Sequence, residues 1–326
     1  MDKKFPDNSP IEGSIVFGPV PSRRLGSSLG INTMKVKTCT YNCVYCQVGR
    51  TRRCLINRDK YLNPHEVFKL AAKKIKLLSE KKVRIDYISI VPIGEPTLDM
   101  YLSEEIELLR GVGCKIAVFT NSSLLWNDEV KESLMLADYV SVKVDTVKET
   151  TWRKLDRPHG KLKLNDILNA VIEFSKSFKG VLSTETMLVK NINDNIDELK
   201  ELSEYLRNIR RYKSYFTIPV RPPAECYVSA PDIQTLSELS GFIKIKISDS
   251  EMLCFSEGKD FDGADNLEEE LLGIMAVHPM TEEAVKKFII SKHGDPKILE
   301  RMIAGRLIVK HNYDGKTFYR NYNLVK

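Results

Sequence analysis

The chain has 326 residues, of which 42% are hydrophobic and 29% charged, as in an ordinary globular protein rather than a disordered or fibrous one. Its formal net charge of +6 permits a polyanionic partner but does not require one, because the excess is small for this length. The polar residues 1–10 resemble neither a signal peptide nor a membrane anchor, and no apolar run approaches the roughly 20 residues that cross a bilayer, so we expect a cytoplasmic protein without a membrane partner.

Short apolar strands alternate with helical patterns over most of the chain. Strands separated by helices pair in parallel through right-handed crossovers. Six such units are fewer than the eight of a closed barrel, so we expect an α/β fold built on an open, partial (β/α)6 barrel, with its reactive groups at the carboxyl ends of the strands. The expected strands are 28–34, 87–91, 115–120, 139–144, 181–188 and 215–220, and the expected helices are 65–79, 103–112, 128–136, 164–178 and 196–207.

The last part of the chain has a different pattern. Residues 256–266 are polar, contain two glycines and predict a linker. Three expected helices follow, the second with Thr281 as its N-cap, and then two strands flank a turn at Asp314-Gly315. Three helices and a hairpin favour a winged-helix-like α+β domain. The predicted organisation is a tail (1–13), a barrel (14–255), the linker (256–266) and a C-terminal domain (267–326).

Cys39, Cys43 and Cys46 lie within one run of eight residues after the first expected strand. A [4Fe–4S] cubane normally takes four thiolates, so three close-set thiolates leave one iron open to another ligand. Zinc is the alternative, but it needs a fourth Cys or His at short spacing, and neither Cys54 nor His65 completes such a set. The odd total of seven cysteines also favours metal chemistry over a disulfide framework.

With Tyr45 before the third cysteine, this motif resembles that of the radical S-adenosylmethionine (SAM) superfamily, and further matches follow in order over roughly residues 14–255. Residues 18–26 and 220–225 resemble a poorly characterised branch grouped with the wyosine-forming tRNA enzymes, although those enzymes carry further cysteines upstream and this chain has none before Cys39. The resemblance implies that SAM chelates the open iron. It also implies that one electron, from a flavodoxin- or ferredoxin-type donor, cleaves a C–S bond of SAM to give a 5′-deoxyadenosyl radical.

The resemblance further implies SAM-binding residues near the cysteines. Tyr45 would lie beside the adenine, and the segment Gly94, Glu95, Pro96 would meet the methionine ammonium. Asn121 would also lie near SAM, where the family often carries a glycine as the next residue. A simple turn is the alternative for both of these positions.

Later strands supply further candidates. Ser141, Lys143 and Asp145 share one strand face by the two-residue period, and polar residues on a strand buried on both faces must point into a wet or liganded interior. The resemblance gives Lys143 and Asp145 to the SAM carboxylate and ribose, with an internal ion pair as the alternative. Glu185 would meet the ribose or the substrate, with a pair to a neighbouring Lys or Arg as the alternative. Arg221 would clamp a carboxylate or phosphate. Arg23 and Arg24 are expected to reach the same mouth of the barrel.

The leading hypothesis is an enzyme that makes a carbon radical on its substrate. The basic run 50–53, the winged helix and the resemblance favour an RNA base, such as one in tRNA, as substrate. A peptide or protein gripped by the winged helix is the rival, and a small metabolite is third. A redox-sensing DNA-binding protein is the non-enzymatic alternative, which the signals at Gly94–Glu95 and Lys143–Asp145 disfavour, because a sensor needs no cofactor cradle.

Overall fold

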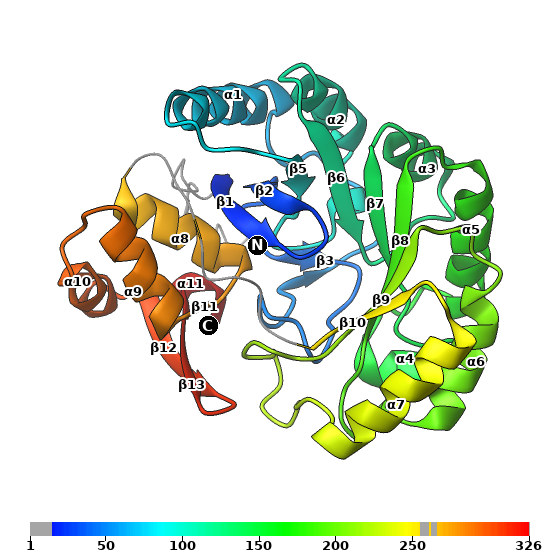
Figure 1. Ribbon diagram of the computed structural model, residues 1–326. Helices are drawn as coiled ribbons and strands as arrows, with labels where there is room; N and C mark the ends of the chain where they lie inside the picture. The colour runs from blue at the N-terminus through cyan, green and yellow to red at the C-terminus, as the bar shows by residue number, and fades with distance from the viewer. Residues whose placement is uncertain (1–14, 255–260, 262–265, 326) are drawn as a thin grey trace, which may run out of the picture.

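The computed structural model describes residues 15–254, 261 and 266–325. Its main sheet has eight strands in the order β1-β2-β5-β6-β7-β8-β9-β10, and Figure 1 shows this sheet curving with α1, α2, α3, α5 and α6 along its outside. The strands are β1 (Val16–Ser22), β2 (Gly26–Ile31), β5 (Tyr87–Ile90), β6 (Lys115–Thr120), β7 (Tyr139–Lys143), β8 (Val181–Met187), β9 (Lys213–Thr217) and β10 (Ser250–Leu253). The helices are α1 (Pro64–Glu80), α2 (Leu102–Arg110), α3 (Asp128–Met135), α4 (Glu149–Leu155), α5 (Leu164–Ser177), α6 (Ile196–Leu206) and α7 (Ile233–Lys246).

All six expected strands are present, and β2 through β10 run parallel to their neighbours. The sheet is nevertheless larger than the six-unit barrel predicted. β10 adds a seventh parallel strand, which the sequence hides because its four residues are mostly half-buried and do not form an apolar run. β1 pairs antiparallel with β2 at the other edge. Its prolines, Pro19 and Pro21, argue against a central strand, but an edge strand tolerates them because one side needs no ladder donors.

The C-terminal segment contains the three helices and the hairpin that the sequence predicts. Its elements are α8 (Leu267–Val277), β11 (Met280–Thr281), α9 (Glu282–Ser291), α10 (Ile298–Ala304), β12 (Ile308–Tyr313), β13 (Lys316–Asn321) and α11 (Tyr322–Val325). The strands form an antiparallel sheet in the order β11-β13-β12. Thr281 caps α9 as expected by accepting from the Ala284 amide (3.2 Å). Asp314 and Gly315 both have positive φ, as a two-residue type I′ hairpin turn requires. The predicted linker lies outside the described residues, except for 261 and 266.

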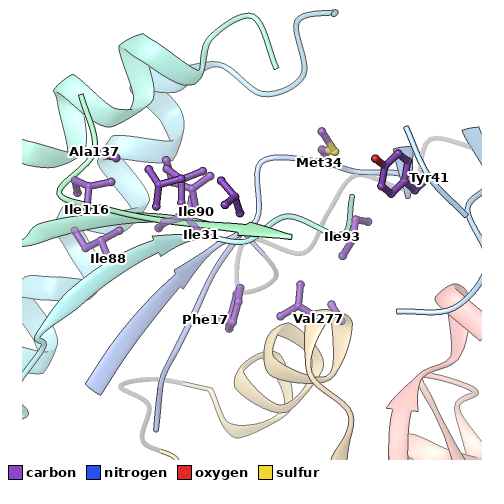
Figure 2. Close-up of a cluster of buried hydrophobic side chains, with 14 of the residues drawn as sticks. Phe17, Ile31, Met34, Tyr41, Ile88, Ile90, Ile93, Ile116, Ala137 and Val277 are labelled. Atoms are coloured by element: carbon purple, nitrogen blue, oxygen red, sulfur yellow. The ribbon is translucent and has the colours of Figure 1, made fainter. Parts of the chain in front are cut away.

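One hydrophobic core extends from the barrel into the C-terminal segment. Figure 2 shows Val277 of α8 beside Phe17 of β1, with Ile31 and Ile90 of the central strands above them. Gly30 of β2 is needed here, because any Cβ at this position would overlap the Phe17 ring. A buried ion pair between Lys74 of α1 and Glu270 of α8 adds a polar link. The C-terminal segment is therefore packed against the barrel through a shared hydrophobic core.

None of the helices in the part of the chain that the structure describes combines the length and hydropathy of a membrane span.

Glu105 of α2 is a buried carboxyl group close to the buried side chains of Asp99 and Thr33. The side chain of Glu105 is 1% exposed, and neither of its carboxylate oxygens has a hydrogen-bond partner among the described residues. Burial, and then the nearby Asp99 carboxylate, raise the pKa of Glu105 to about 9. Asp99 Oδ2 and Thr33 Oγ1 are also buried without a partner in the described chain. Buried polar groups left in this way reduce stability.

We therefore expect Glu105→Gln to stabilise the fold in a pH-dependent way. A folded pKa of about 9 against an ordinary value of 4.5 means that the folded state retains a proton that the unfolded chain loses as pH rises. The penalty is absent below about pH 4.5 and grows toward pH 9. Urea unfolding should show a difference near zero at pH 4 and a gain of several kcal/mol at pH 9. The exposed Glu107→Gln on the same helix is the control, and a gain independent of pH would contradict the assignment.

Candidate active site

The cysteine run forms a loop at the carboxyl edge of the sheet, directly after β2, as predicted. The short strand β3 (Thr38–Cys39) opens the loop, and β4 (Arg53–Cys54) closes it by pairing in parallel with β3. The Leu55 amide donates to the Cys39 carbonyl (3.0 Å), which fixes the two ends together. The loop also contacts the end of α4, because the Val44 amide donates to the carbonyl of Leu155, the last residue of that helix (2.9 Å).

Each of the three predicted ligand thiols has a different polar neighbour. Asn121 Nδ2 donates to Cys39 Sγ (3.5 Å), Cys43 Sγ donates to Asp156 Oδ1 (3.3 Å), and Lys37 Nζ donates to Cys46 Sγ (2.9 Å). Burial raises the pKa of Cys39 to about 12 and the pKa of Cys43 as well. At Cys46 burial acts in the same direction, but the Lys37 ammonium outweighs it and lowers the pKa.

This donor set fits an iron–sulfur cluster better than a zinc ion. No group of three or more Cys, His, Asp or Glu within the described ranges is arranged around a single ion. A cubane differs because it distributes its thiolate ligands over separate irons. All three cysteines are free thiols. The two thiols with raised pKa values must lose their protons to bind iron, so assembly of the cluster releases protons.

The predicted segment 94–96 contacts the start of the cysteine loop. The Glu95 amide donates to the carbonyl of Thr38 (3.0 Å), the residue before Cys39. A Cβ on Gly94 would overlap that same carbonyl oxygen, so this close approach requires glycine. Pro96 begins a short 3₁₀ helix, η2 (Pro96–Leu98), for which the Glu95 side chain is the N-cap.

The Glu95 carboxylate is already satisfied by the protein. It accepts from the amide and the hydroxyl of Thr97 (3.1 and 2.7 Å), from Thr120 Oγ1 (2.5 Å) and from the Asn121 amide (2.8 Å). Burial raises its pKa, and these hydrogen bonds oppose the shift. In this arrangement Glu95 ties the loop after β5 to the end of β6, and through Asn121 it acts on the surroundings of Cys39.

Ser122 has a backbone conformation that glycine adopts most easily. Its φ is 64°, in the left-handed region that glycine adopts most easily. The Ser122 hydroxyl donates to the carbonyl of Lys143 at the end of β7 (2.6 Å), which compensates for the strained conformation. Asn121 is held beside the loop by a second bond from its Nδ2 to Thr40 Oγ1 (2.8 Å).

Charged side chains occupy the interior of the barrel below the loop. Lys143 Nζ lies 3.2 Å from Glu185 Oε1, and Arg24 forms an ion pair with Glu185 Oε2. Burial alone would raise the pKa of Glu185, but Arg24 and Lys143 lower it to about 2. Arg24 Nη1 also donates to the hydroxyl of Ser141 (3.5 Å). Lys143, Glu185 and Ser141 thus belong to one network, which joins β7 to β8.

The expectation that Arg24 reaches the same mouth as the cysteines is wrong. Arg24 lies in the turn that precedes β2, whereas the cysteine loop follows β2, so the two enter the barrel from opposite ends. The guanidinium lies over the rings of Phe119 and Tyr215, 5.4 and 5.3 Å from their centroids. Arg24 therefore covers the amino end of the barrel, and from that end its guanidinium neutralises the Glu185 carboxylate.

Tyr45 joins the cysteine loop to this network. Its hydroxyl donates to the carboxylates of Asp145 and Asp156, the second at 3.1 Å, and its ring centroid lies 4.7 Å from Lys143 Nζ. Asp145 Oδ1 also accepts from the Met187 amide (2.6 Å). Burial raises the pKa values of both carboxyls. Asp156 was not predicted; it follows α4, a helix of seven residues without a side-chain N-cap that the sequence reading missed.

Arg221 lies outside this network. Its Nη1 donates to Gln47 Oε1 (3.1 Å), and its Nη2 lies 2.9 Å from His278 Nε2. The basic run after the cysteines is also engaged within the protein: Arg50 pairs with Glu225 (2.8 Å), and Arg52 donates to the carbonyl of Asn323.

Gly94→Ala should specifically impair loading of the cysteine loop. The added methyl group must displace the Thr38 carbonyl next to Cys39, at a cost of about 1–3 kcal/mol. Anaerobic reconstitution should give several-fold less bound iron than in the wild-type protein, measured per folded chain. Gly241→Ala in α7 is the matched control, because a Cβ there meets no atom within 4 Å. Equal iron content in Gly94→Ala and the wild type would contradict this role.

Comparisons with known proteins agree with this geometry. Residues 35–211 match the model of the Radical SAM superfamily. The chain is 41% identical to the UPF0026 protein MJ1312 of Methanocaldococcus jannaschii over 94% of this chain and 95% of that protein. A more distant relative, 22% identical over 78% of this chain and 72% of its own length, is a probable dual-specificity RNA methyltransferase RlmN of Finegoldia magna. A solved radical SAM methyltransferase from Sphaerobacter thermophilus is similar in fold, with a TM-score of 0.55 and 13% identity over 70% of this chain and 66% of that one.

Proposed function

The chain belongs to the radical SAM superfamily, whose enzymes use a [4Fe–4S] cluster and S-adenosylmethionine, and from this we propose that Cys39, Cys43 and Cys46 are the ligands of that cluster. The observation that carries the proposal is the convergence of the three thiols in one loop at the carboxyl edge of the barrel. Asn121, Asp156 and Lys37 each contact one of them. The remaining four cysteines lie outside this run.

When bound, the cluster and SAM supply one-electron cleavage of SAM, with the electron coming from a separate donor of the flavodoxin or ferredoxin type. The residues of the chain hold and orient these groups. We assign the SAM-facing side of the loop to Tyr45, Asn121, Lys143 and Asp145. The Lys143 ammonium suits a carboxylate, and the Asp145 carboxylate suits a hydroxyl or ammonium donor. Ser141, Glu185 and Arg24 hold Lys143 in place from below.

The ligand assignment predicts a sharp difference between cysteines. Alanine at position 39, 43 or 46 should abolish the release of 5′-deoxyadenosine from SAM under anaerobic conditions with dithionite, with at least a hundredfold loss. Cys54→Ala is the matched control, since Cys54 pairs with Cys39 across the two short strands. It should retain the iron and most of the cleavage activity. Cleavage that survives loss of any of the three cysteines would refute the assignment.

For the substrate, we propose a base in RNA. The support is the charge of residues 286–326, the later part of the C-terminal segment, together with the relationship to an RNA methyltransferase. Residues 286–326 contain ten Lys and Arg against three Asp and Glu, a net charge of +7, which exceeds the +6 of the whole chain. Lys297, Arg306, Lys310 and Lys316 are exposed there. Such a cationic surface attracts phosphates irrespective of sequence.

We further propose that residues 267–326 form a winged-helix-like domain, separated by residues 256–266 from a radical SAM barrel spanning 14–255. The order α8, β11, α9, α10, β12, β13 and the strand order β11-β13-β12 support this proposal. The α10 helix spans seven residues, and Arg301 on it is paired with Asp295 (2.5 Å). We therefore attribute RNA contact to backbone phosphates at the hairpin rather than to base reading by this helix.

RNA binding should depend on salt and on the hairpin. The logarithm of the association constant should fall linearly with the logarithm of salt concentration, by about 0.7 per phosphate contacted. Lys310→Gln and Lys316→Gln should each weaken binding several-fold and reduce that slope, while Lys179→Gln, exposed on the barrel, should do neither. Filter binding of bulk tRNA is sufficient. Salt-insensitive binding of a peptide, with no binding of RNA, would favour a peptide-modifying enzyme instead.

A further inference from the structure

Three segments distant in sequence converge on Gln47, the residue that follows Cys46. Arg320 of β13 donates from Nη2 to the backbone carbonyl of Gln47 (3.0 Å). The Gln47 side chain donates from Nε2 to the carbonyl of Val277 at the end of α8 (2.8 Å) and accepts from Arg221 (3.1 Å). The C-terminal segment thus holds the cysteine loop by its backbone, one residue beyond a proposed cluster ligand.

Arg320 brings a buried charge to this position. The residue is 5% exposed, although it lies on a hairpin whose other cations, Lys310 and Lys316, are exposed. A guanidinium stays protonated in proteins, so the charge persists in spite of burial. Burial lowers its pKa. Its hydrogen bond to the Gln47 carbonyl places the guanidinium beside the residue that follows Cys46.

The charges around the three thiols are unevenly distributed. Lys37, also buried at 4% exposure, donates to Cys46 Sγ (2.9 Å), so two cations lie on the Cys46 side. At Cys43 the polar contact is instead a carboxyl group, that of Asp156 (3.3 Å). Charges in a poorly solvated site interact more strongly than charges at the surface.

We propose that Arg320 is a positioning residue of the iron–sulfur site, supplied by the C-terminal segment, which fixes the loop after Cys46 and raises the reduction potential of the cluster. The proposal rests on the proposed function, because it requires a cluster on Cys39, Cys43 and Cys46. The one-electron reduction adds a negative charge to the cluster, and a cation buried nearby stabilises the reduced form more than the oxidised form. Net charge and hydrogen bonding around the sulfurs are established determinants of cluster potential.

The test is a redox titration of the reconstituted full-length protein, in which the EPR signal of the reduced cluster is followed anaerobically. Arg320→Gln removes the charge while keeping an amide donor, and its midpoint potential should be more negative than that of the wild type. Arg320→Lys keeps the charge, and its midpoint potential should stay close to that of the wild type. Lys179→Gln removes the same charge from an exposed position on the barrel and should leave the potential unchanged. A wild-type potential in Arg320→Gln, or an equal shift in Lys179→Gln, overturns the proposal.

Arg320→His provides a second route if the glutamine variant loads poorly. Its potential at pH 6, where the imidazole is charged, should be closer to the wild type than its potential at pH 9, after the pH dependence of the wild type is subtracted. No such difference would count against the proposal. Iron content and 5′-deoxyadenosine release are measured in parallel. If the wild type binds no iron and releases no 5′-deoxyadenosine, the proposed function is wrong. If all variants bind iron and cleave SAM, and their clusters have the same midpoint potential, only the role of Arg320 is wrong.

Discussion

The arrangement of the site follows from one constraint: charged side chains enclosed by a barrel must neutralise one another. Lys143 and Arg24 share the carboxylate of Glu185, and Lys143 also lies over the Tyr45 ring. Removing one partner of such a set would leave an uncompensated buried charge, which costs several kcal/mol. The network therefore fixes the side-chain conformations of Lys143 in β7 and Glu185 in β8. Through the hydrogen bonds of Tyr45 and Cys43 to Asp156 it also holds the cysteine loop.

The parts of the molecule that the sequence predicted are those governed by local pattern. The strand 115–120 was predicted residue for residue, because an apolar run bounded by polar residues defines it. Polar residues that alternate along β7 pointed correctly to a charged interior. The superfamily itself followed from three cysteines and Tyr45.

What the sequence did not reveal depends on contacts between distant segments. The prolines of β1 concealed an edge strand, and the short β10 had no apolar run. Arg24 was placed at the wrong end of the barrel, although a turn that precedes β2 must lie at the amino end of that strand. Asp156 and Arg320 could not be associated with Cys43 and Cys46, from which 113 and 274 positions separate them, by any local pattern. Glu95 was expected to face a cofactor, but the hydroxyls of Thr97 and Thr120 engage its carboxylate.

The shared core of α8 and β1 limits how the chain can be divided. Val277 and Met280 belong to the same apolar cluster as Phe17 and Ile31, and Glu270 pairs with Lys74 of α1. Cutting the chain before α8 would expose this apolar face to water and leave Lys74 without its carboxylate. The barrel and the C-terminal segment therefore depend on each other for the burial of this face.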